Sequence, residues 1–196
     1  MTKPKYIEGK IKRLTRELNE IDQYSYPGAD SDERTNYVSM LERKRDDRVR
    51  SVVLQLHTSI EDLLNLYLIS NVLRISDPTK RSRKLSTTRG KALHKMLYGG
   101  GSLGFEMKLN FALALGLISA RAQAKLMELN TIRNKCSHNW LLKVPQRRKR
   151  RPGQKKPPLL LYEGRDLHGV QVLKDFIAEF SRFYVLFWLK YRRPRT

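Results

Sequence analysis

The sequence predicts an all-α protein, a bundle of five or six helices. Apolar residues recur at spacings of three and four along most of the 196-residue chain, the pattern of helices with one buried face. No segment alternates apolar and polar residues with a period of two over a useful length, so strands are not expected. Apolar residues make up 40% of the chain, enough for the core of one domain with polar extensions.

The chain is expected to begin with an extension of one helix and a loop over residues 1–45, followed by a helical domain over residues 46–196. A surface helix at about 5–22 follows from apolar residues spaced three and four apart, namely Ile7, Ile11, Leu14, Leu18 and Ile21. Pro27 and Gly28 then mark a loop.

A long helix is expected at about 36–73. Its second half carries an apolar stripe that must pack against other helices, formed by Val53, Leu56, Ile60, Leu63, Leu64, Tyr67 and Leu68. A basic, polar connection follows in ISDPTKRSRKLSTTRG, and then a short helix in KALHKMLYG. The glycines of residues 99–104 (GGGSLG) fit G-x-G-x-x-G, the pattern of a dinucleotide-binding loop. That loop needs a preceding strand, and a helix is predicted there, so we interpret the glycines as a turn between helices.

Three further segments complete the predicted bundle. A helix at 105–115 ends at Gly116, a residue suited to the carboxyl end of a helix. Ser119 can cap the next helix, which continues through NTIRNKC. A basic loop rich in proline and glycine is expected at 143–166, before a last helix at about 167–191.

Charge and cysteine content limit the function classes. The 40 basic residues against 19 acidic ones give a net charge of +21, which favours nucleic acid as partner. An acidic protein, an anionic membrane surface or merely basic chain ends are the alternatives. We expect no signal peptide in MTKPKYIEGKIKR and no membrane span, because the most apolar stretch, 176–189, is short and charged. The single cysteine, Cys136, excludes an intrachain disulfide, favours a cytoplasmic setting and is expected to be buried. No Cys/His cluster has metal-ligand spacing, so neither a metal nor another cofactor is expected.

The segment IRNKCSH carries the candidate catalytic residues Arg133, Asn134 and His138. Asn134 and His138 are four residues apart and share a helix face. Arg133 and His138 lie about 140° apart round an ideal helix, so one copy does not bring the two heads together. Two copies facing each other across a two-fold axis can form one compact site.

Such a cluster suits cleavage of RNA without a metal. An imidazole transfers protons near neutral pH, and a guanidinium holds phosphate and stabilises charge on phosphorus. The 2′-hydroxyl of RNA is an internal nucleophile. His138 is expected near a helix carboxyl terminus, where the helix dipole favours the protonated form and hence proton donation. Spacing alone also fits a solvated helix end.

The motif resembles the hallmark of the HEPN superfamily, Arg-x4-6-His, commonly with a polar residue after the Arg. The likeness extends through GSLGFEMKLNFALALGLISARAQAKLMELNTIRNKCSH, which is similar to the core of the mannitol operon repressor family. SIEDLLNLYL resembles the earlier core helix, so about residues 50–142 are covered. Cys136 and Ser137 depart from the family, which often has an aromatic residue and Ala at these positions.

The resemblance implies a HEPN-like helical domain that dimerises with both motifs at the interface. It also implies a metal-independent endoribonuclease, in which Arg133 and His138 are catalytic and Asn134 is the supporting polar residue. RNA is then the substrate, and a cognate antitoxin or regulatory protein is a further partner in a toxin or phage-defence setting. The alternative is a catalytically silent nucleic-acid-binding or transcription-regulatory member.

Other polar residues are candidates for supporting roles. A basic run after the motif is expected to hold RNA phosphates, with a solvated loop as the alternative, and consists of Arg147, Arg148, Lys149, Arg150, Arg151, Lys155 and Lys156. His57, Glu61 and Asp62 are expected to be structural, with a role beside the motif as the alternative. His94 and His168 are expected to be isolated surface residues.

Overall fold

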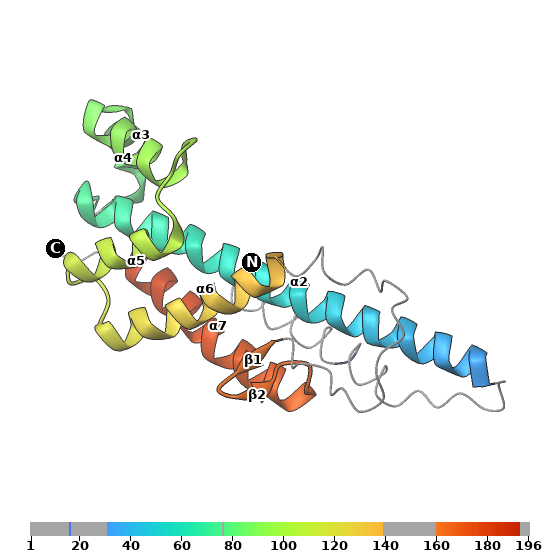
Figure 1. Ribbon diagram of the computed structural model, residues 1–196. Helices are drawn as coiled ribbons and strands as arrows, with labels where there is room; N and C mark the ends of the chain where they lie inside the picture. Colours follow the sequence, from blue (N-terminus) through green and yellow to red (C-terminus); the bar gives the residue numbers. More distant parts are fainter. Residues whose placement is uncertain (1–15, 17–30, 76, 139–159, 193–196) are drawn as a thin grey trace. The chain divides into compact units, whose positions relative to one another are not determined.

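The structure is a computed structural model that describes residue 16 and residues 31–75, 77–138 and 160–192 (Figure 1). These residues contain six α-helices, one short 3-10 helix and a two-stranded sheet, which confirms the predicted all-α class. The helices are α2 (Ser31–Val72), α3 (Arg81–Ser86), α4 (Thr88–Tyr98), α5 (Phe105–Ala114), α6 (Ala120–His138) and α7 (Val170–Arg192). None of the helices described is long and apolar enough to cross a membrane. Of the helix predicted at 5–22, the structure describes only Arg16, which is helical.

The long helix α2 begins about five residues before its predicted start at 36. No proline or glycine occurs between Gly28 and the end of α2 at Val72, so nothing in this stretch opposes helix. The helices α4, α5, α6 and α7 begin and end within a few residues of the predicted positions.

The chain forms two compact units, each assembled from segments far apart in sequence. Unit 1 comprises residues 1–54 and 132–179, and unit 2 comprises residues 55–131 and 180–196. The boundaries fall inside α2, α6 and α7, so each of these three helices contributes residues to both units.

The core of unit 2 is built by apolar side chains of α2, α5, α6 and α7. The most completely buried are Ile60, Leu64, Leu68, Leu109, Leu126, Leu129 and Phe187. Tyr67 of α2 lies against Phe187 of α7, with 6.1 Å between the ring centroids. The apolar stripe predicted for the long helix is therefore buried, and each such side chain contributes roughly 1.5–3 kcal/mol to stability.

A short turn joins α5 to α6 in unit 2, and the sequence predicted both of its ends. Gly116 adopts a left-handed conformation with φ of 66°. Its N–H donates to the Leu113 carbonyl, and the Leu117 N–H donates to the Ala112 carbonyl, the bond pattern of a Schellman motif. The Ser119 hydroxyl then accepts the Ala122 N–H at 3.2 Å as the cap of α6.

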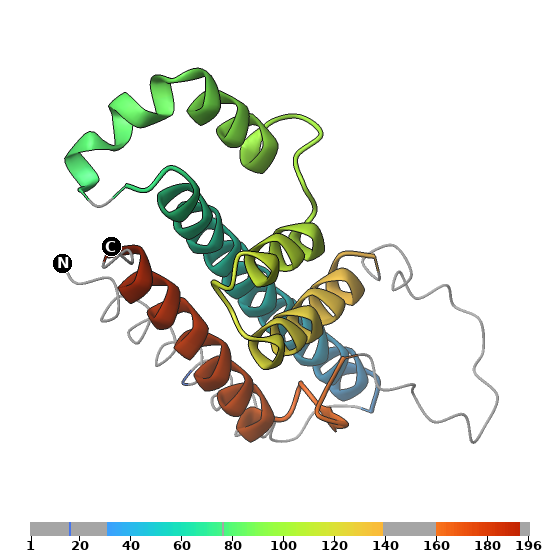
Figure 2. The same ribbon diagram turned by 90° about the vertical axis from the view of Figure 1, so that its left-hand side faces the viewer.

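The predicted polar connection before α4 is wrong, because it contains the 3-10 helix Pro78–Lys80 and the helix α3 (Figure 2). No proline or glycine interrupts the stretch between Pro78 and Gly90, and α3 ends where α4 begins. The Thr87 hydroxyl accepts the Gly90 N–H at 3.1 Å and so caps α4.

The glycine-rich segment 99–104 joins α4 to α5, as predicted for a turn between helices. Its Ser102 N–H donates to the Gly99 carbonyl, and Gly101 has φ of 79°, which favours glycine. The helix α4, and not a strand, directly precedes it, so the dinucleotide-loop interpretation is excluded.

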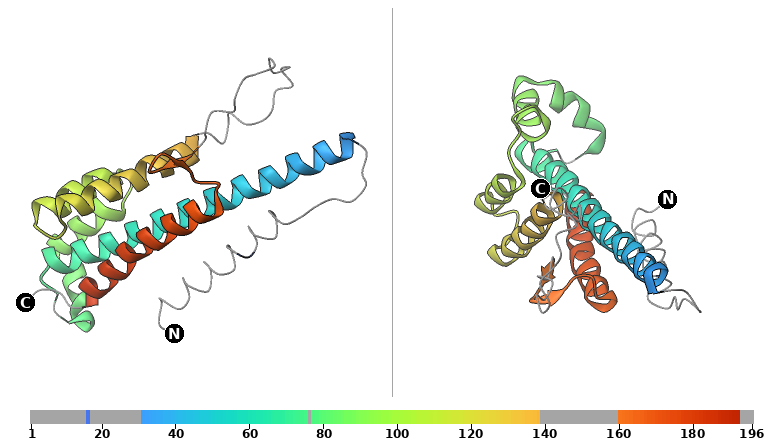
Figure 3. Two further views of the ribbon diagram at one scale, coloured as in Figure 1. Left: turned by 90° about the horizontal axis from the view of Figure 1, so that it is seen from below. Right: turned by 45° about the vertical axis from the view of Figure 1, so that its right-hand side comes forward.

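Unit 1 contains a small hairpin that the sequence analysis did not predict. The strands β1 (Leu161–Tyr162) and β2 (Arg165–Asp166) pair antiparallel, with positive φ at both turn residues, Glu163 (49°) and Gly164 (74°). Such a turn matches the twist of a hairpin. Figure 3 shows the hairpin in orange beside the start of α7.

Contacts with α7 explain why so short a hairpin persists. The Tyr162 ring meets the Phe176 ring edge-on at a centroid distance of 5.3 Å, and its hydroxyl bonds to Glu179. The expectation that residues 143–166 form only a loop is therefore wrong at 161–166. Two-residue strands are too short for a period-two pattern to reveal them.

The close approach of α3 and α4 makes Gly90 a test of the fold. Alanine in a helix is usually more stable than glycine by about 1 kcal/mol. A Cβ at Gly90 would lie 2.2 Å from the Lys84 carbonyl oxygen and 2.7 Å from Leu85 Cα. We expect Gly90→Ala to lower the free energy of unfolding in urea by about 1–3 kcal/mol. Gly100→Ala, where no atom lies within 4 Å of the added Cβ, is the control and should be nearly neutral. A more stable Gly90→Ala protein would contradict the contact.

Candidate functional site at the carboxyl end of α6

The candidate motif lies in the last turns of α6, on the part of the helix that belongs to unit 1. Ile132 and Cys136 are buried there, and Arg133 and Asn134 are half-buried. The helix continues through His138, so the backbone places Asn134 and His138 one turn apart, as predicted. The side chain of His138 lies outside the described residues.

The two polar residues Arg133 and Asn134 are joined directly. The Arg133 Nη1 donates to the Asn134 Oδ1 at 2.9 Å. One of the five N–H donors of the guanidinium is used in this bond. The amide therefore anchors one end of the guanidinium, and this bond leaves its other N–H donors unused. The Ser137 hydroxyl donates to the Arg133 carbonyl at 3.2 Å and so stays within the helix.

A buried arginine from α2 holds the end of α6. Arg50 is 6% exposed, and its Nη1 donates to the Cys136 carbonyl oxygen at 2.6 Å. The last four carbonyls of a helix have no partner within the helix. Arg50 supplies such a partner in the same turn as Arg133, and it was not among the predicted site residues.

Asp46 fixes the guanidinium of Arg50. Its Oδ2 accepts from the Arg50 Nε at 2.7 Å, one helix turn away on α2. The i, i+4 spacing of Asp46 and Arg50 is visible in the sequence. That spacing gives no sign that Arg50 reaches Cys136, which is 86 residues away.

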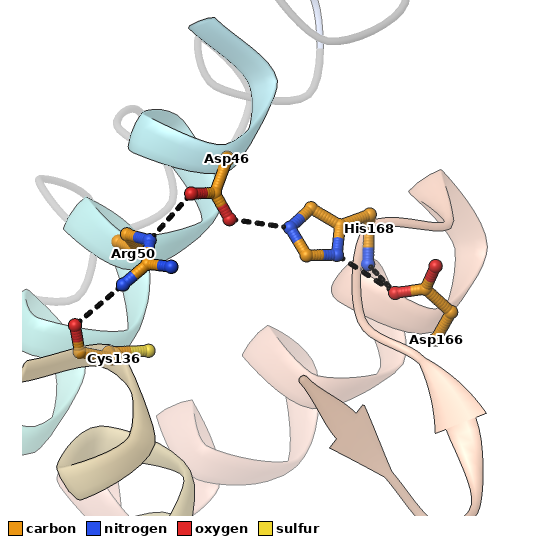
Figure 4. Close-up of polar contacts among 5 residues, drawn as sticks. All are labelled: Asp46, Arg50, Cys136, Asp166 and His168. Carbon is orange, nitrogen blue, oxygen red and sulfur yellow. Dashed lines mark hydrogen bonds and ion pairs between the residues drawn. The ribbon is translucent and has the colours of Figure 1, made fainter. Parts of the chain in front are cut away.

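The second oxygen of Asp46 binds His168, which also binds Asp166 (Figure 4). The His168 Nε2 lies 2.9 Å from Asp46 Oδ1, and its Nδ1 lies 2.8 Å from Asp166 Oδ1. Two carboxylates can both accept from the ring only if both ring nitrogens carry protons. The prediction that His168 is an isolated surface residue is therefore wrong.

The two carboxylates change the acid–base properties of this cluster. The hydrogen bond to Asp46 raises the pKa of His168 against the opposing effect of burial, and Asp166 adds to the rise. Burial alone would raise the pKa of Asp166, but its bonds to the His168 N–H and ring lower it. The cluster is thus most stable with a charged imidazole between two ionised carboxylates.

Cys136 is a buried structural residue, as predicted. It is 3% exposed, and burial raises the pKa of its thiol to about 11, with Arg50 opposing the rise. A thiol in this state is a poor nucleophile at neutral pH. In the described part of the chain, no group of three or more His, Cys, Asp or Glu residues could hold a metal ion.

The polar residues predicted on the long helix form a separate buried network in unit 2. The His57 Nε2 lies 3.3 Å from Asn130 Oδ1. The His57 ring packs on the Phe105 ring, with 4.4 Å between the ring centroids. Glu61 pairs with Lys108 at 2.5 Å, and Lys108 is only 2% exposed. Removing one partner of a buried pair leaves an uncompensated charge, so these contacts support the structural role.

Asp62 and the basic run after the motif are the other polar residues that the sequence singled out. Asp62 is exposed on α2, and its pKa is raised by partial burial and by the charge of Glu61. The basic run Arg147–Lys156 lies outside the described residues.

Comparison with protein-family models, curated proteins and solved structures finds no match for this chain.

The His168 cluster predicts a pH dependence of stability. A histidine with a raised pKa stabilises the fold fully below its ordinary value of 6.5 and loses that contribution as pH rises through the folded-state pKa. Asp166, whose pKa is lowered from 3.8, contributes above that value and loses its contribution in acid. We therefore expect the loss of unfolding free energy in His168→Gln to be largest between pH 4 and 6.5 and to shrink towards pH 9, measured by urea titrations.

The exposed histidine on α4 provides the control for the loss of an imidazole, because His94→Gln removes a ring that forms no salt bridge among the described residues. A His168→Gln effect that stays constant from pH 5 to pH 9 would argue against a charged ring in the cluster.

The burial of Cys136 predicts an unreactive thiol. In the native protein at pH 7.5, a thiol reagent such as dithionitrobenzoate should modify Cys136 at least 100-fold more slowly than in unfolding concentrations of urea. Arg50→Met removes the bond to the Cys136 carbonyl and should speed the reaction by loosening the end of α6. Equal rates in native and unfolded protein would show that the thiol is accessible.

Proposed function

We propose that the chain is a HEPN-type, metal-independent endoribonuclease that acts as a homodimer. Arg133 holds the scissile phosphate, Asn134 orients the guanidinium and His138 transfers protons. The observation that carries the proposal is the 2.9 Å bond from Arg133 to Asn134 at the end of a helix that continues through His138. A half-buried guanidinium fixed by an amide, rather than by a carboxylate, keeps its positive charge available for a phosphate.

Two copies of the motif can bring an arginine and a histidine to the same phosphate, which one copy cannot do. On an ideal helix, positions 133 and 138 lie about 140° apart round the axis, so one copy does not bring an arginine and a histidine there together. A two-fold axis close to this helix end would place the Arg133 of one copy near the His138 of the other. The site then holds two imidazoles and two guanidiniums around a single phosphate.

The reaction is a transfer within the RNA strand. The 2′-oxygen bonds to phosphorus, and the bond from phosphorus to the 5′-oxygen breaks. One imidazole accepts the 2′ proton, and the other gives a proton to the departing 5′-oxygen. The guanidiniums stabilise the charge that develops on the phosphorane oxygens. The products are a 2′,3′-cyclic phosphate and a 5′-hydroxyl, and no water or metal enters the cleavage step.

A catalytically silent nucleic-acid-binding or regulatory protein is the second candidate function. The net charge of +21 favours it, because phosphate binding requires cations and no cleavage chemistry. In that case Arg133 and His138 contribute to binding or to a dimer interface. The two functions differ in whether RNA is cut, and in whether His138 is needed.

The endoribonuclease proposal predicts a defined mutational pattern. In buffer containing EDTA, the protein should cut a labelled RNA and leave 2′,3′-cyclic phosphate ends. Loss of a general acid or base typically costs 10²- to 10⁴-fold, so we expect His138→Ala to slow cleavage by roughly that factor. Arg133→Lys keeps the charge but loses the planar fork and should slow cleavage strongly as well.

Lys135→Ala is the control, because Lys135 is exposed on the same turn and is not part of the motif. It should cleave RNA nearly as fast as the parent chain. An RNA left intact by the parent chain, or cut equally by His138→Ala, would leave nucleic-acid binding as the function. In cells, growth arrest on overexpression of the parent chain but not of His138→Ala would support the nuclease.

A further inference from the structure

The helices α3 and α4 of unit 2 carry a basic surface, whose first part was predicted as a polar connection and whose second part was predicted as a short helix. No acidic residue occurs between Asp77 and Glu106. The basic residues in this interval are Lys80, Arg81, Arg83, Lys84, Arg89, Lys91 and Lys95. Arg81 and Lys84 have structural partners: Arg81 donates to the Tyr191 hydroxyl, and Lys84 donates to the carbonyls of Leu73 and Arg74.

The other five cations are exposed and form no salt bridge within the described part of the chain. They are Lys80, Arg83, Arg89, Lys91 and Lys95. A surface of one sign, without interspersed acids, attracts polyanions over several ångströms. Because these residues lie on described helices, the surface is distinct from the basic run at 147–156.

The outer face of α4 adds aromatic rings to these cations. Lys91, His94, Lys95 and Tyr98 share one face at spacings of three and four, while Leu93 and Leu97 on the opposite face are buried. The rings of His94 and Tyr98 are stacked, with 5.0 Å between centroids and 29° between planes. Tyr98 is 40% exposed, so part of this stacked pair faces outward.

The neighbourhood of Tyr98 keeps the ring uncharged. Burial raises the pKa of the Tyr98 phenol, and the nearby Asp62 and Glu61 add to the rise while Arg81 and Asn65 oppose it. A neutral ring can stack on a base without repelling phosphate. The two carboxylates mark the acidic edge of the surface on α2.

Cations alternating with exposed rings are the features that bind single-stranded nucleic acid. Bases stack on the aromatic faces, and lysines contact successive phosphates. Lys91 and Lys95 are one turn apart, about 6 Å along the helix axis, so one strand can reach both. An anionic membrane fits less well, because a membrane-surface helix needs an exposed apolar face, and the two leucines of α4, Leu93 and Leu97, are buried.

We propose that the outer face of α4, flanked by α3, binds single-stranded RNA, with bases stacked on the His94–Tyr98 pair and phosphates on Lys91 and Lys95. The choice of RNA over DNA rests on the proposed function; the preference for an unpaired strand rests on the exposed rings. This surface would hold substrate by contacts that do not take part in cleavage.

The test is RNA binding in a His138→Ala background, where cleavage cannot consume the probe. Fluorescence anisotropy with a labelled 12-nucleotide oligouridylate would be measured over a series of salt concentrations. Each lost phosphate contact lowers the salt slope by about 0.7 for a single strand, so Lys91→Ala/Lys95→Ala should lower it by about 1.4. Tyr98→Ala should weaken binding roughly 5- to 100-fold with little change of slope, and Tyr98→Phe should restore it.

Arg121→Ala/Arg182→Ala is the matched control, since it removes two exposed charges of unit 2 from α6 and α7. It should leave affinity and slope nearly unchanged, and circular dichroism should show every variant folded. Normal binding by the α4 variants would overturn the proposal, as would equal loss in the control. Tighter binding of duplex RNA, of DNA of the same length or of phosphatidylserine vesicles would also overturn it.

This outcome is separable from that of the proposed nuclease. A chain that binds through α4 but never cleaves RNA would retain this surface and lose the nuclease proposal. A chain that cleaves through His138 but binds RNA normally without Lys91, Lys95 and Tyr98 would support the nuclease proposal and contradict the proposed binding surface on α4.

Discussion

The bond from Arg50 to the Cys136 carbonyl fixes the part of unit 1 in which the candidate motif lies. A guanidinium that is 6% exposed needs partners for its donors, because an unpaired buried charge is strongly destabilising. The carbonyl at the end of α6 and the carboxylate of Asp46 supply them. The Cys136 carbonyl in turn needs Arg50, since this carbonyl has no partner within its own helix. The position of Arg133 therefore depends on a residue of another helix.

The same constraint extends from Asp46 to the hairpin region. Asp46 uses one oxygen for Arg50 and the other for His168, and His168 binds Asp166 at the end of β2. Alternating positive and negative groups satisfy one another along this chain of contacts. The contacts of Tyr162 with Phe176 and Glu179 hold the hairpin to α7 independently of these polar contacts. Unit 1 combines these polar contacts with buried apolar side chains of its own, among them Val49, Leu167 and Phe176.

Three basic side chains show that a high positive charge serves the fold as well as a polyanion. Arg50 binds the Cys136 carbonyl at the end of α6, Lys84 binds the Leu73 and Arg74 carbonyls after α2, and Lys190 binds the Leu117 carbonyl after α5. Cations are favourable at such positions because the carboxyl end of a helix carries partial negative charge. The cations left for a nucleic acid are those without such partners, and Lys91 and Lys95 on α4 are among them.

Local patterns in the sequence determined most of the helical architecture. The end of α5 at Gly116, the cap at Ser119 and the stripe from Leu56 to Leu68 depend on neighbours within a turn or two, so spacing and residue type suffice to predict them. The adjacency of Arg133 and Asn134 and the helical spacing of Asn134 and His138 are equally local. Their proposed chemistry came from the motif and its resemblance, not from any tertiary contact.

Only the tertiary structure decided which side chains support the end of α6 and which remain exposed. Arg50 and Cys136 are 86 residues apart and Asp46 and His168 are 122 apart, distances over which no periodicity carries information. Likewise, composition marked residues 80–95 as basic, yet it could not separate Lys84, bound to carbonyls, from Lys91 and Lys95, which are exposed. Whether a charged side chain supports the fold or remains available to a partner depends on which polar groups lie within about 3 Å of it. Packing between segments distant in sequence places those groups.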